Sequence, residues 1–322
     1  MSSQVLVPAA AHTRIADALD DLSPAVQPLL WSPDGVVDTD GNPVADVAPE
    51  VAWVAIDLLF SGDLPAYVDT LLAPGTVQWV QGCLAGTDGP PFQRILGAGC
   101  RLSSSDAPNA GVAEYVMSTV LHTVHGGTAR TDAHRERRWH QAPWREINGM
   151  TWAVIGFGSI GGQLATRARA FGVEVIGVRR TAVTDDRANR MATLAELPAV
   201  LAEADVVVLA CPLTDETRGL ADAEFFRAMR PDAMLVNVAR GPVVDDQALL
   251  AALDAGELER AILDVFDVEP LPDDSPLWQH PGLVITSHVA GAGSGIIPRG
   301  DAVFLEHLED YLAGRPLRLE VR

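Results

Sequence analysis

Three residues that can bind anions or move protons each follow a short apolar stretch in the second half of the chain. Arg240 follows "AMLVNV", Glu269 follows "AILDVFD", and His288 follows "LVIT". Apolar stretches without polar alternation are typical of parallel strands that are buried on both faces. Because ligands of an open parallel sheet bind beyond the carboxyl ends of its strands, we expect the three side chains to meet at one edge.

These residue types suit hydride transfer to or from a carbon next to a carboxylate. An arginine can hold a substrate carboxylate through two parallel hydrogen bonds. A histidine can give or take a proton near neutral pH, and a carboxylate beside it favours its protonated form and fixes its tautomer. Taken singly, Arg240 could be a surface residue, Glu269 a solvated loop acid, and His288 a helix cap or the partner of a buried backbone group.

A glycine-rich turn, "VIGFGSIGG", precedes these three residues in the chain. Gly156, Gly158 and Gly161 form the pattern G-x-G-x-x-G between a predicted strand, "TWAVI", and a predicted helix, "GGQLATRARAFG". In this context the glycines permit a tight turn, a close approach of pyrophosphate to the backbone, and close packing of helix on strand. The turn therefore predicts a dinucleotide site, and the alternative is a tight strand–helix turn without a ligand.

The next predicted strand, "VEVIGVRR", ends in Arg179 and Arg180. A dinucleotide turn is usually followed, about 20 residues later, by an acid that binds the ribose 2′-hydroxyl. Arginines at that place can instead pair with a 2′-phosphate, and Thr181 can add a contact. We therefore expect NADP(H) to be preferred over NAD(H), the alternative being that both arginines are solvated at a strand exit and cofactor choice is set elsewhere.

The elements that must position these residues indicate an α/β fold with parallel sheets. Strands are expected within 4–9, 51–57, 76–82 and 100–105, and then at "WAVIGFG", "VEVIGVR", "DVVVLAC", "AMLVNVAR", "AILDVFD" and "LVITSH". Long helices are expected at 109–126 and 301–314, with a polar connector at 126–149. The predicted organisation is a substrate-binding part (1–107), a dinucleotide-binding domain (108–290), and a C-terminal segment (291–322) that returns to the first part.

Composition narrows the classes of function. The net charge of −20 argues against a nucleic-acid partner, since phosphate binding needs a basic face. All 23 basic residues are arginines, which excludes a Schiff-base lysine and a phosphate-loop lysine. No apolar run in the sequence is long enough for a membrane span, so we expect neither a membrane span nor a signal peptide. Its three scattered cysteines favour a reduced, cytoplasmic protein.

Five segments together resemble the D-isomer-specific 2-hydroxyacid dehydrogenases, in the order typical of that family: "VIGFGSIG", "CPLTDETRGL", "LVNVARGPVVDDQAL", "ILDVFDVEPLPDDSPLW" and "ITSHVAG". The resemblance is clear over residues 151–291, and its branch is that of the glyoxylate and hydroxypyruvate reductases. It implies two Rossmann-like or flavodoxin-like domains with a cleft between them, the substrate domain being discontinuous. It also implies that Arg240 binds the substrate carboxylate and that His288, paired with Glu269, is the acid/base.

The resemblance extends to further residues. It implies a carboxylate-binding loop in "CLAGTDG", where Gly86 and Thr87 offer backbone amides and Leu84 and Ala85 shape the wall; the alternative is an ordinary glycine-rich turn. It implies that Asp264 holds the nicotinamide amide. The full set of residues expected to bind the cofactor is Gly156, Gly158, Ser159, Ile160, Gly161, Arg179, Arg180, Cys211, Pro212, Thr217, Val238 and Asp264.

Histidines and tryptophans gather near the polar connector. His122, His125, His134 and His140 have no cysteine near them, so we expect no metal site. Trp139 and Trp144 could pack at an interface, and the resemblance implies a homodimer formed through this region. Two other functions stay open: a relative of the formate or phosphite dehydrogenases, of which glutamate at 269 disfavours the formate branch, and a nucleotide-sensing corepressor on the same fold.

Overall fold

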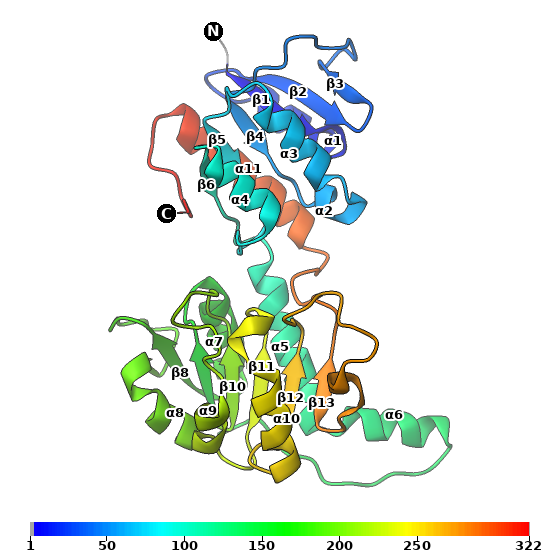
Figure 1. Cartoon of the computed structure of the whole chain (residues 1–322), viewed down its shortest axis with the longest axis vertical. Helices are drawn as coiled ribbons and strands as arrows, with labels where there is room; N and C mark the ends of the chain where they lie inside the picture. Colours follow the sequence, from blue (N-terminus) through cyan, green and yellow to red (C-terminus); the bar gives the residue numbers. More distant parts are fainter. Residues whose placement is uncertain (1–2, 322) are drawn as a thin grey trace. The chain divides into compact units, whose positions relative to one another are not determined.

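The computed structural model describes residues 3–321 of the chain. It contains two compact units. Unit 1 comprises Met1–Pro108 and Ser294–Arg322, and unit 2 comprises Asn109–Gly293. The boundaries expected from the sequence fell after residues 107 and 290. The C-terminal helix thus belongs to the same unit as the N-terminal segment, although the two are far apart in the sequence (Figure 1).

Unit 1 is built on a six-stranded sheet in the order β3-β2-β1-β4-β5-β6. All neighbouring strands are parallel except β3, which is antiparallel to β2. The strands are β1 (Gln4–Pro8), β2 (Gln27–Ser32), β3 (Gly35–Val37), β4 (Val51–Trp53), β5 (Trp79–Gln81) and β6 (Arg101–Ser103).

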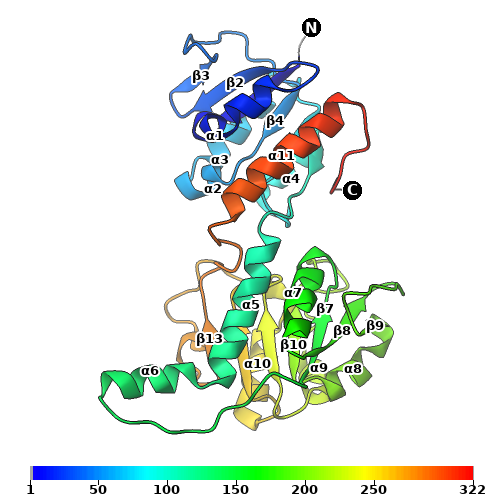
Figure 2. The ribbon, with the colours of Figure 1, turned by 180° about the vertical axis from the view of Figure 1, so that it is seen from behind.

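Helices cover both faces of this sheet. On one face lie α1 (Ala9–Asp20) and α11 (Ile296–Leu312); on the other lie α3 (Leu64–Leu72) and α4 (Pro90–Gly97), with the short α2 (Asp57–Ser61) nearby (Figures 1 and 2). The Trp53 ring stacks on that of Phe304 with centroids 4.4 Å apart. Each face therefore has its own apolar core, and α11 contributes to both, with Phe304 and Leu308 in one and Ile296 in the other.

Unit 2 is built on a seven-stranded sheet, parallel throughout, in the order β13-β12-β11-β10-β7-β8-β9. The strands are β7 (Thr151–Ile155), β8 (Glu174–Arg179), β9 (Arg190–Thr193), β10 (Val206–Leu209), β11 (Met234–Asn237), β12 (Arg260–Leu263) and β13 (Leu283–Ile285). The strand order reverses between β7 and β10. In sheets of this kind ligands bind at the carboxyl ends of the strands, at that reversal.

In unit 2, α5 (Asn109–Val124) and α7 (Ser159–Ala170) pack on one face of the sheet. On the other face lie α8 (Leu197–Glu203), α9 (Ala223–Ala228) and α10 (Asp246–Ala255). The helix α6 (Gly127–Arg135) extends away from the body of the unit (Figure 2). Three 3₁₀ turns complete it: η1 (Leu194–Glu196), η2 (Gly241–Val243) and η3 (Pro276–Gln279).

The α/β class with parallel sheets is confirmed, but some expected elements differ. The connector at 126–149 was expected to be irregular and contains α6. The last helix begins at Ile296, five residues before the expected start at 301. Pro298 lies in its first turn, where a helix needs no backbone donor, so the proline does not delay the helix. The strands β2, β3 and β9 were not predicted.

Bilayer-spanning helices need about 20 apolar residues. Between residues 3 and 321 no helix is both long enough and apolar enough to cross a membrane.

Candidate active site at the sheet edge of unit 2

The glycine turn joins β7 to α7 at the carboxyl edge of the sheet. Gly156 has φ +91°, and a Cβ there would lie 2.4 Å from the Cα of Cys211 in the loop after β10. Gly161 is also tightly packed, since its Cβ would lie 3.2 Å from the carbonyl oxygen of Gly156. Gly158, by contrast, faces open space. The space over Gly158, at the start of α7 with Ser159 and Ile160, fits an approaching pyrophosphate, because the free amides of a helix start attract anions.

The arginine pair lies at the end of β8, next to this turn in the sheet. Arg179 is exposed and makes no ion pair within 4 Å with another of residues 3–321. The neighbouring Arg180 lies 3.7 Å from Glu216, between side chains that are both largely exposed. At that distance and exposure the pair contributes little, so Arg180 can be drawn to another anion.

A third arginine, not singled out in the sequence, lies beside the same turn. The Arg187 guanidinium pairs with Asp185, with Nη2–Oδ2 at 2.5 Å, and lies 5.8 Å from the centre of the Phe157 ring. Hydrogen bonds from Arg187 lower the pKa of Asp185 to about 2. A Cβ at Gly162, in the first turn of α7, would lie 2.1 Å from Nη1 of Arg187. Arg187 therefore lies directly against the helix start.

The loop that follows β10 carries three of the residues expected to bind the cofactor. The Thr217 hydroxyl donates to the carbonyl oxygen of Pro212 at 2.7 Å and accepts from the amide of Thr214 at 2.8 Å. Burial raises the pKa of the Cys211 thiol to about 11, so it stays protonated near neutral pH. Thr217 thus holds the loop closed, and Cys211 lies against the glycine turn as a small apolar side chain.

Arg240 follows β11 and lies against the neighbouring strand exit. Its Nη1 donates to the carbonyl oxygen of Ala239 at 2.7 Å, and the side chain is half-buried. The next residue, Gly241, is so close to the chain after β12 that a Cβ would lie 1.8 Å from the backbone of Phe266. The exits of β11 and β12 are therefore packed together, which brings the Arg240 segment beside the segment that carries Glu269. Val238, between β11 and Arg240, is buried.

His288 and Glu269 form a hydrogen-bonded pair. Nδ1 of His288 lies 2.7 Å from Oε2 of Glu269, and the side chains are 51% and 36% exposed. The other carboxylate oxygen, Oε1, accepts from the amide of Phe266 at 2.9 Å, which fixes the plane of the carboxylate. Because Glu269 accepts the hydrogen bond, Nδ1 carries the hydrogen, and Nε2 remains for a substrate.

A cavity of about 400 Å³ adjoins this pair. Its remaining lining is mostly apolar: Phe266, Pro270, Leu271, Trp278 and Ser287. The indole nitrogen of Trp278 donates to the carbonyl oxygen of Pro272 at 2.9 Å, so the ring turns no donor into the cavity. The His288–Glu269 pair therefore borders a partly apolar space large enough for a small molecule.

Asp264, expected to hold the nicotinamide amide, is only 1% exposed. Its carboxylate accepts three hydrogen bonds from the segment that carries His288: from the Thr286 hydroxyl at 2.6 Å, the amide of Val289 at 2.9 Å and the amide of Ala290 at 2.8 Å. These contacts could not be predicted from the sequence, because they join two strand exits that lie 22 to 26 residues apart in the chain.

The loop expected to bind the substrate carboxylate, Leu84 to Thr87, belongs to unit 1. It follows β5 and leads to α4, with Ala85 exposed and the other three half-buried. The carbonyl oxygens of Leu84 and Thr87 accept from the Ser105 amide and from Gln93 Nε2, so the loop has a fixed course. Arg240, Glu269 and His288 belong to unit 2.

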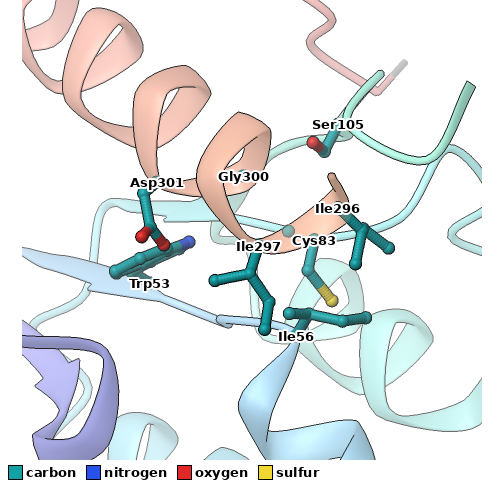
Figure 3. Close-up of a pocket in the computed structure, with 9 residues that line it drawn as sticks. Trp53, Ile56, Cys83, Ser105, Ile296, Ile297, Gly300 and Asp301 are labelled. Atoms are coloured by element: carbon teal, nitrogen blue, oxygen red, sulfur yellow. The ribbon is translucent and has the colours of Figure 1, made fainter. Parts of the chain in front are cut away.

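Beneath this loop, Cys83 borders a cavity of about 10 Å³ (Figure 3). The cavity lies between the sheet and the start of α11, where Ile296, Ile297 and Asp301 line it. A space of this size holds at most one water molecule. Burial raises the pKa of the Cys83 thiol to about 12. This part of unit 1 is packed interior rather than a substrate pocket.

The histidines near α6 have separate partners. His122 lies beside Thr128, His125 packs against the Trp144 ring with centroids 4.1 Å apart, and His140 lies beside Arg138. Among residues 3–321, no group of three or more His, Cys, Asp or Glu side chains is arranged to hold a metal ion. Trp139 is 88% exposed.

The comparison with known proteins bears directly on this sheet edge. The family described as "D-isomer specific 2-hydroxyacid dehydrogenase, NAD binding domain" matches residues 117–290, just over half of the chain. The chain belongs to this family. An uncharacterized protein of Corynebacterium melassecola, 32% identical over 302 residues, is similar over 91% of this chain and 96% of its own length.

Two further family members carry more specific descriptions. A glyoxylate/hydroxypyruvate reductase B of Klebsiella pneumoniae is 36% identical over 211 residues, 63% of this chain; the match spans 65% of that enzyme, less than two thirds. A D-isomer specific 2-hydroxyacid dehydrogenase from Xanthobacter autotrophicus Py2, solved in complex with NADPH and MES, is similar in structure with a TM-score of 0.77. It is 28% identical and covers 100% of this chain and 98% of its own. The family resemblance is thereby confirmed, and the protein is an NAD(P)-dependent oxidoreductase of the 2-hydroxyacid type.

Proposed function

We propose that this protein is an NADPH-dependent reductase of small 2-keto acids, with glyoxylate and hydroxypyruvate as the leading substrates. The observation that supports this most is the His288–Glu269 pair, with Nδ1 and Oε2 2.7 Å apart, at the same sheet edge as the glycine turn and Arg240. The similarity to glyoxylate/hydroxypyruvate reductase B favours the same substrates.

In this proposal each residue has a separate task. The cofactor supplies the hydride when bound. Arg240 pairs with the substrate carboxylate and polarises the ketone oxygen beside it. His288 gives a proton from Nε2 to that oxygen, and Glu269 holds Nδ1 so that the imidazole keeps its orientation. The amides of Gly86 and Thr87 take part in holding the carboxylate, with Leu84 and Ala85 as the wall.

The residues of unit 2 fit a dinucleotide. The open space at Gly158 and the first amides of α7 suit the pyrophosphate. Thr217 fixes the loop that carries Cys211 and Pro212, which we assign to the wall of the adenosine and nicotinamide sites together with Val238. A nicotinamide amide would lie toward Asp264, at the exit of β12.

Cofactor choice depends on the arginines at the end of β8. Within residues 3–321 Arg179 makes no ion pair shorter than 4 Å, and Arg180 has one with Glu216 at 3.7 Å, so both can meet a 2′-phosphate. Asp185, whose pKa the charge of Arg179 helps to lower, is already held by Arg187. A hydrogen bond between charged groups contributes about 1.5–3 kcal/mol, which corresponds to a preference of roughly ten- to hundredfold for NADPH.

The test is kcat/KM with NADPH and with NADH for the parent and for Arg179→Asp. The parent is expected to favour NADPH, and the variant to lose NADPH activity far more than NADH activity, because an acid repels the 2′-phosphate and accepts the 2′-hydroxyl. Arg190→Asp is the matched control: it makes the same charge change at the start of β9, away from the carboxyl edge. A parent that prefers NADH would refute the assignment.

Assembly and location complete the proposal. Trp139 and Trp144 are exposed, and α6 extends from unit 2, which favours a homodimer formed through residues 126–149. The three cysteines are free and buried, as expected in a reducing cytoplasm. Light scattering of the parent and of a Trp139→Ala, Trp144→Ala double variant measures whether the protein forms a dimer. The proposal requires that the parent be larger than a monomer.

A further inference from the structure

Asp264 is a buried carboxylate whose hydrogen bonds all run to the segment that carries His288. One oxygen, Oδ1, accepts from the Thr286 hydroxyl at 2.6 Å and from the Val289 amide at 2.9 Å, and Oδ2 accepts from the Ala290 amide at 2.8 Å. No arginine or histidine nitrogen within residues 3–321 lies within 4 Å of it. Three hydrogen-bond donors, rather than a cation, offset the free-energy cost of burying the Asp264 carboxylate.

The backbone adds two further hydrogen bonds at the same place. The His288 amide donates to the carbonyl oxygen of Asp264 at 2.7 Å, and the Thr286 amide donates to that of Leu263 at 3.0 Å. Asp264 therefore holds residues on both sides of His288 through its side chain and His288 itself through its backbone. Hydrogen bonds from residues 286, 288, 289 and 290 therefore join the turn to the exit of β12.

His288 needs such fastening because its backbone has φ +52°, in the left-handed region. A residue with a Cβ adopts that region only when the surrounding contacts impose it. The imidazole is half exposed, and within residues 3–321 the side chain that it pairs with is Glu269. Its direction therefore depends on the turn that Asp264 fixes.

The chain of hydrogen bonds continues to α5. The Tyr115 hydroxyl lies 2.6 Å from that of Thr286. A threonine has a single hydroxyl hydrogen, which here points to Asp264, so Tyr115 must donate to Thr286. Burial, together with the negative charge of Asp264, raises the pKa of Tyr115 to about 12, so it keeps its proton throughout the neutral range.

We propose that Tyr115, Thr286 and Asp264 form a positioning chain that sets the orientation of the His288 imidazole. The proposal rests on the proposed function for His288 as the proton donor. It gives Asp264 a task that is separate from any contact with the nicotinamide amide. Both carboxylate oxygens of Asp264 already accept hydrogen bonds from the His288 segment, so this task needs no contact with the cofactor.

Thr286→Val tests the chain, because valine has the shape of threonine without its hydroxyl. It leaves Asp264 two amide donors and leaves Tyr115 without its acceptor. The expected result is a loss of kcat of about 10- to 100-fold, the scale of a small misplacement of a reacting group. The dissociation constant of NADPH, measured by quenching of protein fluorescence, is expected to stay within about twofold of the parent. Thr119→Val, on α5, is the matched control, because its hydroxyl bonds only within the helix.

Asp264→Asn separates the two roles of Asp264. A positioning role predicts the same split as Thr286→Val, with a lower kcat and intact NADPH binding. A role on the nicotinamide amide predicts weaker NADPH binding in Asp264→Asn and normal kcat in Thr286→Val, and that outcome would overturn the proposal. Tyr115→Phe is the mildest variant and keeps the test open if the other two fold poorly; unchanged kcat in all folded variants also overturns it.

A spectroscopic readout makes the test independent of turnover. The ¹⁵N chemical shifts of the His288 ring show whether one tautomer dominates, as the bond from Nδ1 to Glu269 requires. The parent and Thr119→Val should show one tautomer, and Thr286→Val should show an averaged pair. If the parent reduces no keto acid, the proposed function fails while this measurement still decides the positioning chain; a single tautomer in Thr286→Val contradicts the chain.

Discussion

The two units share one architecture but use their buried and exposed polar groups in opposite ways. In unit 1, Gln81 at the end of β5 is 1% exposed and bonds to the carbonyl oxygens of Gly82 and Ser104 and to His307 on α11. In unit 2, His288 and Glu269, which lie beyond strand ends, are partly open to solvent, with side chains 51% and 36% exposed, whereas the whole residue His307 of unit 1 is 3% exposed. The fold alone therefore does not decide whether a strand end carries chemistry.

The two histidines show what the difference consists of. His307 donates from Nδ1 to Gln81 at 2.7 Å, and since the Gln81 amide group donates elsewhere, the bond joins helix to sheet in one fixed sense. His288 also donates from Nδ1, but to a carboxylate, and its Nε2 remains for a ligand. A neutral, buried partner makes a histidine part of the core, whereas a charged partner at an open edge makes it a candidate acid.

The largest effect is expected for His288→Ala. Loss of the proton donor should lower kcat for keto-acid reduction by about 10²–10⁴-fold, the usual scale of general acid catalysis. NADPH binding should survive, because the glycine turn is untouched. Steady-state kinetics and cofactor titration measure both quantities. Near-normal turnover would make His288 a structural residue, like His307, and would remove the contrast between the units.

A smaller but clear loss is expected for Arg240→Lys. Lysine keeps the charge but lacks the planar fork that matches a carboxylate, so both kcat and KM for the keto acid should worsen, by about tenfold or more in kcat/KM. Steady-state kinetics against the keto acid at saturating NADPH separates the two constants. Equal activity of parent and variant would mean that Arg240 makes no two-bond contact with the substrate.

Glu269→Gln should lower kcat for keto-acid reduction by about tenfold, the scale of a small misplacement of a reacting group. Glu269 accepts the hydrogen bond from Nδ1 of His288 at 2.7 Å and so holds the imidazole with Nε2 free for the substrate. A glutamine amide can present either its oxygen or its nitrogen to Nδ1, so the imidazole is held less firmly. Steady-state kinetics at saturating NADPH measures the loss, and an unchanged kcat would show that the pair does not act in the reaction.

The mildest effect concerns stability in unit 1. Burial, followed by the charge of Arg318, lowers the pKa of His307 below 6.5, against the opposing influence of Glu306, Asp310 and Asp106. Below about pH 6.5 the unfolded chain binds a proton that the folded chain does not, so the free energy of unfolding falls there and is fully retained above it. In His307→Gln this part of the pH dependence should disappear, leaving kcat unchanged.

Denaturant unfolding at about pH 5.5 and about pH 7.5 measures that change. Each kcal/mol of stability corresponds to a shift in Tm of about 2–4 °C for a chain segment of 150–250 residues, so thermal scans provide a second readout. If parent and variant lose the same stability on acidification, the burial of His307 is not what makes unit 1 sensitive to acid.

The strands of unit 2 that carry the candidate site could be predicted because they are apolar and bounded by clear turns. The class of fold and the family resemblance, which rested on those segments, are both confirmed. The strand β9, "RMAT", was missed because an edge strand this short and polar has no apolar pattern. The helix α6 was missed because its residues, "GTARTDAHR", offer no apolar stripe of helical period.

The roles of Arg240, Glu269 and His288 stay predictions. The structure adds the hydrogen bond between Nδ1 of His288 and Oε2 of Glu269, at 2.7 Å. What the sequence could not predict is the support behind them. The bond from the Phe266 amide to Glu269 forms within the loop after β12, and the three bonds to Asp264 depend on the close approach of the exits of β12 and β13. Arg187 was overlooked because it lies in an irregular loop, and only the folded chain brings it over Gly162.

One measurement tests the central claim most directly: turnover of a panel containing glyoxylate, hydroxypyruvate and phosphite, with the matching reduced or oxidised form of both cofactors, by the parent and by His288→Ala. The account predicts NADPH-dependent reduction of a 2-keto acid that His288→Ala abolishes almost entirely. Turnover of phosphite alone would indicate the phosphite dehydrogenase branch. A parent that binds NADPH tightly but turns over none of these compounds would contradict this function. That result would favour a nucleotide-sensing protein.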